Sequence, residues 1–131
     1  MITIKNEKQI KKYYVKKNNT YVFEDDVEFL NNINVKASIK AHNIYAWNWN
    51  IDALNIEAND ICVGNIMALD ICANNIKAHN IEGLNIDANN IDYFAVCFAY
   101  NRIRCNFIKG IHPNAKHFVL DGKLIFKGDE Y

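Results

Sequence analysis

Isoleucine recurs at every fifth position through the middle of the chain. The run is unbroken over nine residues: Ile51, Ile56, Ile61, Ile66, Ile71, Ile76, Ile81, Ile86 and Ile91. A period this strict indicates a repeat architecture. Neighbours on an α-helix are three or four residues apart, so a period of five does not fit a helix. It fits a coil of short strands and corners, and we expect an all-β, single-stranded β-helix.

The other positions of the five-residue repeat show which way its side chains point. The third position is nearly always Ala, with Val63 and Gly83 as exceptions, and the fifth is Asn or Asp. Alternation along a strand sends positions one and three to the same side. We therefore expect Ile and Ala inside, and positions two and four outside. Asn and Asp suit corners because they tolerate left-handed backbone angles, and stacked Asn side chains can form amide ladders.

The fourth position indicates the size of the coil. From residue 54 it reads Leu54, Asn59, Gly64, Leu69, Asn74, His79, Leu84, Asn89 and Phe94. Leu and Asn each return after three repeats, and like residues are expected to stack in adjacent coils. This rhythm predicts a triangular coil of about 15 residues. The repeat gains two residues at 47–50, and two more between Val96 and Ile103, so we expect a bulged corner at each place.

Length and charge indicate a single domain, 1–131, in three parts. Residues 1–38 carry a net charge of +2, residues 39–96 carry −5 and residues 97–131 carry +3. We expect a pentad-repeat β-helix at 39–96 between β-rich caps at 1–38 and 97–131, because bare end coils would expose apolar interior and strand edges. A strand is predicted at 10–17 in the first cap, and a hairpin around Asp121-Gly122 in the second.

The bulk properties limit the classes of partner. The net charge of the whole chain is zero, so it gives no argument for direct binding to nucleic acid, and none is expected. No apolar run approaches the roughly 18 residues of a spanning helix, and the first residues lack an apolar signal core. We expect no membrane partner and a cytoplasmic location. The four cysteines are expected to be free thiols.

The Ile-x-Ala-x-Asn/Asp pentads at 39–96 resemble pentapeptide-repeat β-helices. That family takes four pentads per turn and places its small residue before the large one, whereas Ala follows Ile here. A closer resemblance is to small Ile-x-Ala-x-Asn/Asp repeat proteins of AT-rich bacteria and their phages and mobile elements. The runs YFAVCFAY at 93–100 and KHFVLDGKL at 116–124 are similar to that group's C-terminal signature. The resemblance implies a solenoid, and some pentapeptide-repeat members present an acidic, DNA-like surface to a DNA enzyme.

Four residues near the C-terminus come closest to a chemical site: Cys97, Cys105, His112 and His117. Seven residues separate the two cysteines, whereas paired zinc ligands have two to four between them. A nucleophile pair of Cys97 with His117 would need an orienting group and an electropositive pocket, and the sequence shows neither. We therefore predict no enzyme, no metal and no cofactor. A metal-binding or Cys/His-dependent enzyme that uses the C-terminal cap is the alternative.

Three surface features are candidates for protein binding. The first is an apolar row: Leu54, Met67, Leu69 and Leu84. Exposed apolar patches mark interfaces, although the ends of the chain could instead cover this row. The second is an acidic wall: Asp52, Glu57, Glu82, Asp87 and Asp92. The alternative is that these acids form an ordinary solvated surface. The third is the pair Trp47 and Trp49, because outward Trp is enriched at binding hot spots, although a Trp could instead fill a bulged corner.

These features favour a non-enzymatic protein-binding module. Its sharpest version is a phage or mobile-element inhibitor of a host nucleic-acid enzyme, either an anti-CRISPR protein or a DNA mimic. The apolar row could also join two copies as a homodimer, and a structural, self-assembling β-helix is a further alternative.

Overall fold

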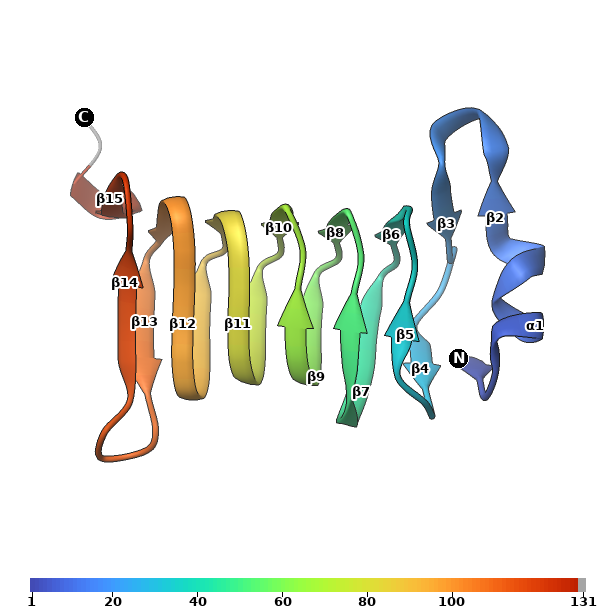
Figure 1. Ribbon diagram of the computed structural model, residues 1–131, viewed down its shortest axis with the longest axis horizontal. Coiled ribbons are helices and arrows are strands. Elements are labelled where there is room, and N and C mark those ends of the chain that lie inside the picture. The colour runs from blue at the N-terminus through green and yellow to red at the C-terminus, as the bar shows by residue number, and fades with distance from the viewer. Residues whose placement is uncertain (130–131) are drawn as a thin grey trace.

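The computed structural model describes residues 1–129 and is a β-solenoid of about six turns, with 63% of these residues in strands and one short helix among them. The coils stack into a rod, with α1 near one end and β15 near the other (Figure 1). The predicted all-β, single-stranded β-helix is therefore confirmed.

Short and long strands alternate from β6 to β11, whereas the strands at both ends of the chain are short. Within residues 1–129 the strands are β1 (Ile2–Ile4), β2 (Tyr14–Val15), β3 (Thr20–Val22), β4 (Val27–Phe29), β5 (Ile33–Asn34), β6 (Ser38–Lys40), β7 (Asn43–Asp52), β8 (Asn55–Glu57), β9 (Asp60–Met67), β10 (Asp70–Cys72), β11 (Asn75–Asp87), β12 (Asn90–Cys105), β13 (Phe107–Gly110), β14 (Lys116–Val119) and β15 (Lys123–Phe126). The helical segments are α1 (Glu7–Ile10) and the 3₁₀ turns η1 (Lys11–Tyr13), η2 (Lys16–Asn18) and η3 (Lys127–Asp129).

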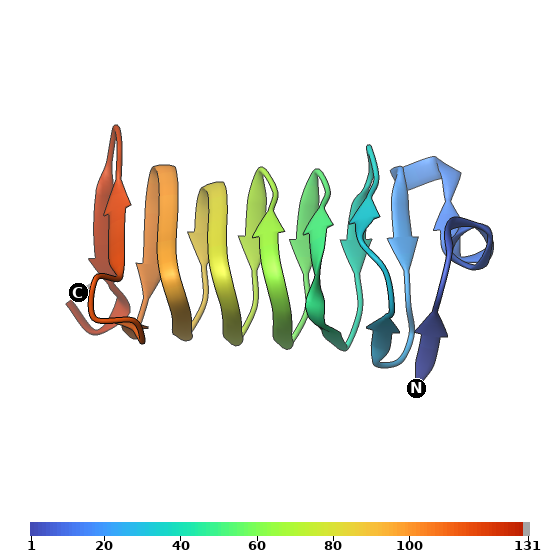
Figure 2. The same ribbon diagram turned by 60° about the horizontal axis from the view of Figure 1, so that its bottom comes forward.

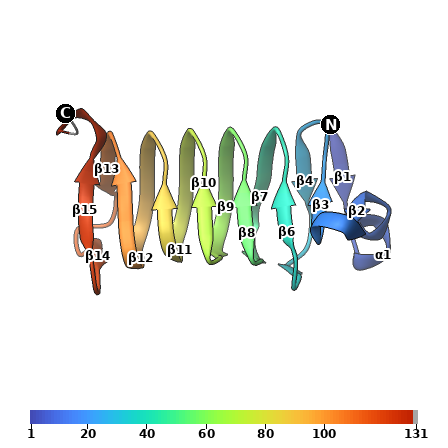
Figure 3. The same ribbon diagram turned by 90° about the horizontal axis from the view of Figure 1, so that it is seen from above.

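Strands in adjacent coils pair in parallel and form three faces. The long strands bend around corners, so one strand can contribute to more than one face (Figures 2 and 3). The first face stacks Ile44, Ile61, Ile76, Ile91 and Ile108. The second face stacks Ile33, Ile51, Ile66, Ile81, Cys97 and His117. The third face stacks Ile39, Ile56, Ile71, Ile86, Ile103 and Leu124. The predicted triangular coil is thus confirmed.

The length of the coil changes along the rod. In the middle, stacked residues are 15 apart, as in the side-chain pairs Asn65 with Asn80 and Asn75 with Asn90. Toward the N-terminus the separation is 17, as between Asn43 and Asp60. It is larger still in the last coil, where Ile103 pairs with Leu124. The average is about 17 residues per turn, so the predicted 15 holds only for the central coils.

The upstream bulge lies where the sequence predicts it. The register between β7 and β9 shifts between Ala46 and Asn50, which places the extra residues at the corner between the first and second faces. Gly64 lies beneath this bulge, and a Cβ atom there would come within 2.8 Å of the Trp49 carbonyl oxygen. The bulge therefore explains why this fourth position holds glycine, while the others hold larger residues.

The downstream bulge differs from the prediction. Two register shifts occur instead of one: between Ala78 and Asn80, and between Gly83 and Asn85. The first places Cys97, not Val96, at the interior position; Val96 is 39% exposed and Cys97 is fully buried. Val96 continues the five-residue spacing from Ile91 in the sequence, but it is not an interior residue. The buried Tyr93 ring fills a third position that normally holds Ala, and it lies directly before this shift.

The interior follows the sequence pattern closely. All nine isoleucines of the repeat are at most 2% exposed. Ala53, Ala58, Ala68 and Ala88 are also buried, which keeps the interior narrow. Burying one such Ile side chain contributes about 1.5–3 kcal/mol, so these stacked columns are the main source of stability.

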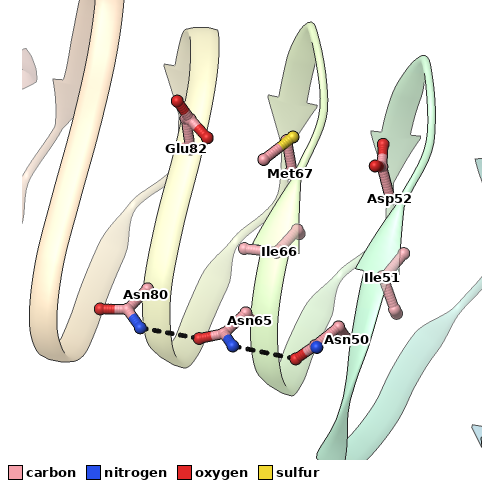
Figure 4. A pocket seen from close by; sticks show the side chains of 8 residues that line it. All are labelled: Asn50, Ile51, Asp52, Asn65, Ile66, Met67, Asn80 and Glu82. Atoms are coloured by element: carbon pink, nitrogen blue, oxygen red, sulfur yellow. Dashed lines mark hydrogen bonds between the residues drawn. The ribbon is translucent and has the colours of Figure 1, made fainter. Parts of the chain in front are cut away.

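The fifth positions form amide ladders along the rod. On the second face, Asn80 Nδ2 donates to Asn65 Oδ1 at 2.8 Å, and Asn65 Nδ2 donates to Asn50 Oδ1 at 2.9 Å (Figure 4). The predicted ladders are therefore confirmed. The expected left-handed corners are not, because Asn19 is the only non-glycine residue with positive φ among those described. The amide side chains at the corners form hydrogen bonds between coils, and their backbones do not adopt positive φ.

The caps depart most from expectation. At the N-terminus, the strand predicted at 10–17 is instead the end of α1, η1, the short β2 and η2; β2 pairs antiparallel with β3. At the C-terminus, the hairpin prediction is wrong: β14 and β15 both pair in parallel with β12 and form part of one more coil. Gly122 lies at its corner, where a Cβ atom would clash with the Asn101 carbonyl oxygen.

Candidate functional site

The predicted leucine row forms one exposed column at the corner between the second and third faces. The backbone N–H of Leu69 donates to the Leu54 carbonyl at 2.6 Å, and that of Leu84 donates to the Leu69 carbonyl at 2.7 Å. Successive leucines therefore lie directly over one another. Leu54 is 37% exposed and Leu69 is 46% exposed, while Leu84 is half-buried. We refer to Leu54, Leu69 and Leu84 as the leucine ridge.

The ridge continues toward the C-terminus through residues that the sequence analysis missed. Tyr100 and Leu120 occupy the same corner on the next two coils, linked by the Leu120 N–H to the Ala99 carbonyl and the Asp121 N–H to the Tyr100 carbonyl. Tyr100 is 40% exposed and Leu120 is 59% exposed. The bulge within β12 hid this continuation, because it breaks the fixed 15-residue spacing.

Met67 lies beside the ridge on the second face. Its outward row runs Asp52, Met67, Glu82, Phe98 and Phe118 on successive coils. Met67 is 49% exposed, and it lies between the carboxylates of Asp52 and Glu82 above a shallow hollow of about 390 Å³ (Figure 4). The structure thus brings Leu54, Met67, Leu69 and Leu84 together as predicted, with two acids on the same face.

The five predicted acids do not form one wall. Asp52 and Glu82 are on the second face, Glu57 and Asp87 are on the third, and Asp92 is on the first between Lys77 and Lys109. The physical reason is the coil itself, because each pentad turns the chain onto the next face. Acids five residues apart therefore face different directions. The prediction of a single acidic surface is wrong.

Asp87 belongs to an ion network. Its carboxylate is 3.1 Å from Arg104 Nη1 and 3.0 Å from Lys127 Nζ. Burial by itself would raise the pKa of Asp87, but the hydrogen bonds and charges of Lys127 and Arg104 outweigh that effect and hold this pKa below its usual value. The network ties η3 back to the central coils, and this acid is engaged within the protein.

The two tryptophans have different environments. Trp47 is 54% exposed and stacks on Tyr45, with the ring centroids 6.5 Å apart. Trp49 is partly buried and packs against the hydrophobic core at the bulged corner. Of the pair, Trp47 is therefore available to a partner, and Trp49 fills the corner.

The Cys/His set does not converge as a metal centre. Cys97 and Cys105 are buried at interior positions on different faces, whereas His112 lies at a corner against the Phe94 ring. His117 lies beside Cys97 on the next coil, but its Nδ1 is 2.6 Å from the Tyr93 hydroxyl. Within residues 1–129, no group of three or more His, Cys, Asp or Glu side chains could hold a metal ion.

The buried thiol is also poorly suited to nucleophilic chemistry. Burial raises the pKa of Cys97 to about 12, with a further contribution from Cys105. A thiol with such a pKa stays protonated at neutral pH, and the thiolate is the reactive form. All four cysteines are free: Cys62, Cys72, Cys97 and Cys105.

None of the described helical segments is long and apolar enough to pass through a lipid bilayer. Comparison with protein-family models, with curated proteins and with solved structures found no match to this chain.

Proposed function

We propose that this chain is a non-enzymatic protein-binding module whose contact surface is the leucine ridge with Met67. The observation that supports the proposal is the column of leucines, two exposed and one half-buried, held in register by 2.6–2.7 Å backbone hydrogen bonds. Contiguous exposed apolar surface marks interaction sites. A rigid sheet scaffold also loses little conformational entropy when a partner binds.

The sharper form of the proposal is an inhibitor of a host nucleic-acid enzyme, encoded by a phage or mobile element and acting in the cytoplasm. It is supported by the resemblance of the pentads and of the runs at 93–100 and 116–124 to repeat proteins from such elements. Asp52 and Glu82, which flank Met67, add charge complementary to a basic, nucleic-acid-binding groove. The acids are divided among three faces, so they do not cover the rod as phosphates cover DNA. We therefore favour docking through the leucine ridge, Met67 and the two flanking acids over mimicry of a DNA cylinder.

A functional assay tests the inhibitor directly. The chain is produced in bacteria whose CRISPR nuclease targets a phage, and plaque counts are compared with those of an empty control. We expect the chain to restore plaques by at least about tenfold and Leu69→Glu to abolish the effect, because a charge on the ridge opposes apolar docking. His79→Glu, at the same pentad position on a different corner, should retain it. Failure against nucleases of several types would contradict the inhibitor.

The leucine ridge could instead bind a second copy of the chain, since a two-fold dimer uses the same patch on both subunits. Light scattering of the purified protein distinguishes this case. A dimer that Leu69→Glu converts to a monomer would assign the ridge to self-association. A mass that is unchanged by Leu69→Glu would exclude the ridge as the seam.

The enzyme alternative has one specific support, the adjacency of Cys97 and His117 across neighbouring coils. The bond between His117 and Tyr93 and the raised pKa of Cys97 weigh against it. Metal analysis of the purified protein tests the related metal-binding form, and less than about half an equivalent of zinc would reject it.

A further inference from the structure

The end of the rod that carries the N-terminus holds a dense group of lysines. Residues 5–17 contain six lysines and one acid, Glu7, for a net charge of +5. Lys5 lies two residues before α1, and the other lysines lie on α1, η1 and η2. All six are exposed: Lys5, Lys8, Lys11, Lys12, Lys16 and Lys17. We refer to these six residues as the lysine cap.

The lysine cap is not neutralised within the protein. Among residues 1–129, none of its ammonium groups forms an ion pair. Apart from Glu7, the nearest acids along the chain are in the turn after β3, where the N-terminal ammonium pairs with Asp25 at 3.2 Å. Glu24 and Asp25 share a shallow hollow with Lys12, Tyr13 and Tyr14. The lysine charges are therefore available to an external anion.

Aromatic rings lie among these lysines. Tyr14 is 39% exposed, and its ring centroid is 5.0 Å from that of Tyr21. The Tyr14 hydroxyl donates to Asn19 Oδ1 at 2.6 Å, which fixes the ring. Tyr13 packs against Phe23 and has Lys12 Nζ 5.3 Å from its ring centre. A fixed, exposed ring between cations is the combination used to stack bases and hold phosphates of single strands.

We propose that the lysine cap, with Tyr14, binds the phosphate backbone and bases of single-stranded nucleic acid. The zero charge of the whole chain led to the opposite expectation, because it averages the lysine cap with the acidic central coils. Phosphates respond to local charge within about 10 Å at ordinary salt. The lysine cap is at one end of the rod, and the site is independent of the leucine ridge.

Fluorescence anisotropy with a labelled oligothymidine of about 16 nucleotides tests the proposal. We expect micromolar affinity at about 50 mM salt, and at least a tenfold loss at about 200 mM salt, because bound lysines release counterions from the strand. Lys11→Glu/Lys12→Glu should weaken binding at least tenfold. The matched control, Lys116→Glu/Lys123→Glu, makes the same charge change in the last coil and should stay within about twofold of the wild type.

Tyr14→Ala separates stacking from charge. It should weaken binding of the single strand about tenfold and leave binding of a duplex of the same length nearly unchanged. Circular dichroism must show the solenoid intact in each variant. The proposal is overturned by no binding at about 50 mM salt, by equal losses in the two lysine variants, or by equal affinity of Tyr14→Ala and wild type for the single strand. Binding to phosphatidylserine vesicles without binding to the oligonucleotide would also overturn it.

Discussion

Ile76 and Ile108 occupy the same position on the first face, two coils apart, in different surroundings. Ile76 lies between Ile61 and Ile91 and is 1% exposed. Among residues 1–129, Ile108 pairs with Ile91 alone, and it is only half-buried because β13 is in the last coil. The same residue at the same position therefore buries different amounts of surface. In a solenoid, the contribution of a repeat depends on its neighbours as much as on its own sequence.

The largest expected effect tests this comparison directly. Ile76→Ala should lower the free energy of unfolding by about 2–5 kcal/mol, because it leaves a cavity between two coils. Ile108→Ala should cost less than half as much, since part of its side chain already contacts solvent. Chemical denaturation followed by circular dichroism measures both. Equal losses would show that the last coil is as well packed as the centre.

The Gly64 position gives a second test within the central coils. Gly64→Ala places a methyl group 2.8 Å from the Trp49 carbonyl oxygen, and we expect a loss of about 1–3 kcal/mol as the bulge is displaced. Gly128→Ala is the control at the end of the chain, where a Cβ atom meets nothing within 4 Å. A neutral Gly64→Ala would mean that the bulge adjusts without cost.

The amide ladder should have a smaller effect. Asn65→Ala removes the side-chain bonds to both Asn50 and Asn80, and each exposed bond contributes about 0.5–1.5 kcal/mol. Asn114→Ala, in the loop of the last coil, retains its own bond because only its backbone N–H is used. Thermal unfolding of the two variants should differ by several degrees. If they melt together, the ladder is not a source of stability.

The smallest effect concerns the network that joins the last coil to the centre. The pKa of Asp87 is held below its usual value, so its stabilisation is present above about pH 4 and is lost as the pH falls through the lowered pKa. Asp87→Asn should cost less than about 1 kcal/mol at pH 7, and its difference from the wild type should become smaller at about pH 2. Denaturation at both pH values checks this, with Asp92→Asn as the control. A variant that differs equally at both pH values would contradict the assignment.

The central coils were predictable from sequence because each pentad repeats one local rule. Ile51 to Ile91 gave the interior, and Leu54, Leu69 and Leu84 gave both the coil size and the ridge. Stacked positions in adjacent coils hold chemically similar residues, so the stacking can be inferred from the sequence.

The ends were harder to predict, because their residues are governed by contacts distant in sequence. Asp121-Gly122 is a strong local hairpin signal, yet β14 and β15 each gain more by pairing with β12. The prediction of a single acidic wall failed for a related reason. The positions of the acids in the sequence do not show that each pentad turns the chain onto the next face. The lysine cap can be read from the sequence, where residues 5–17 carry a net charge of +5. The net charge of residues 1–38 is only +2 because this range also includes acids such as Glu24, Asp25 and Asp26.

The constant 15-residue spacing of the central coils also has an evolutionary consequence. Insertion or loss of one such unit keeps every remaining Ile and Asn in register, and changes the length of the rod by about 4.8 Å. Duplication of residues 61–75, for example, would add one more leucine to the ridge and move the two ends of the rod apart by that step. The length of the rod can therefore change in fixed increments, without redesign of either end.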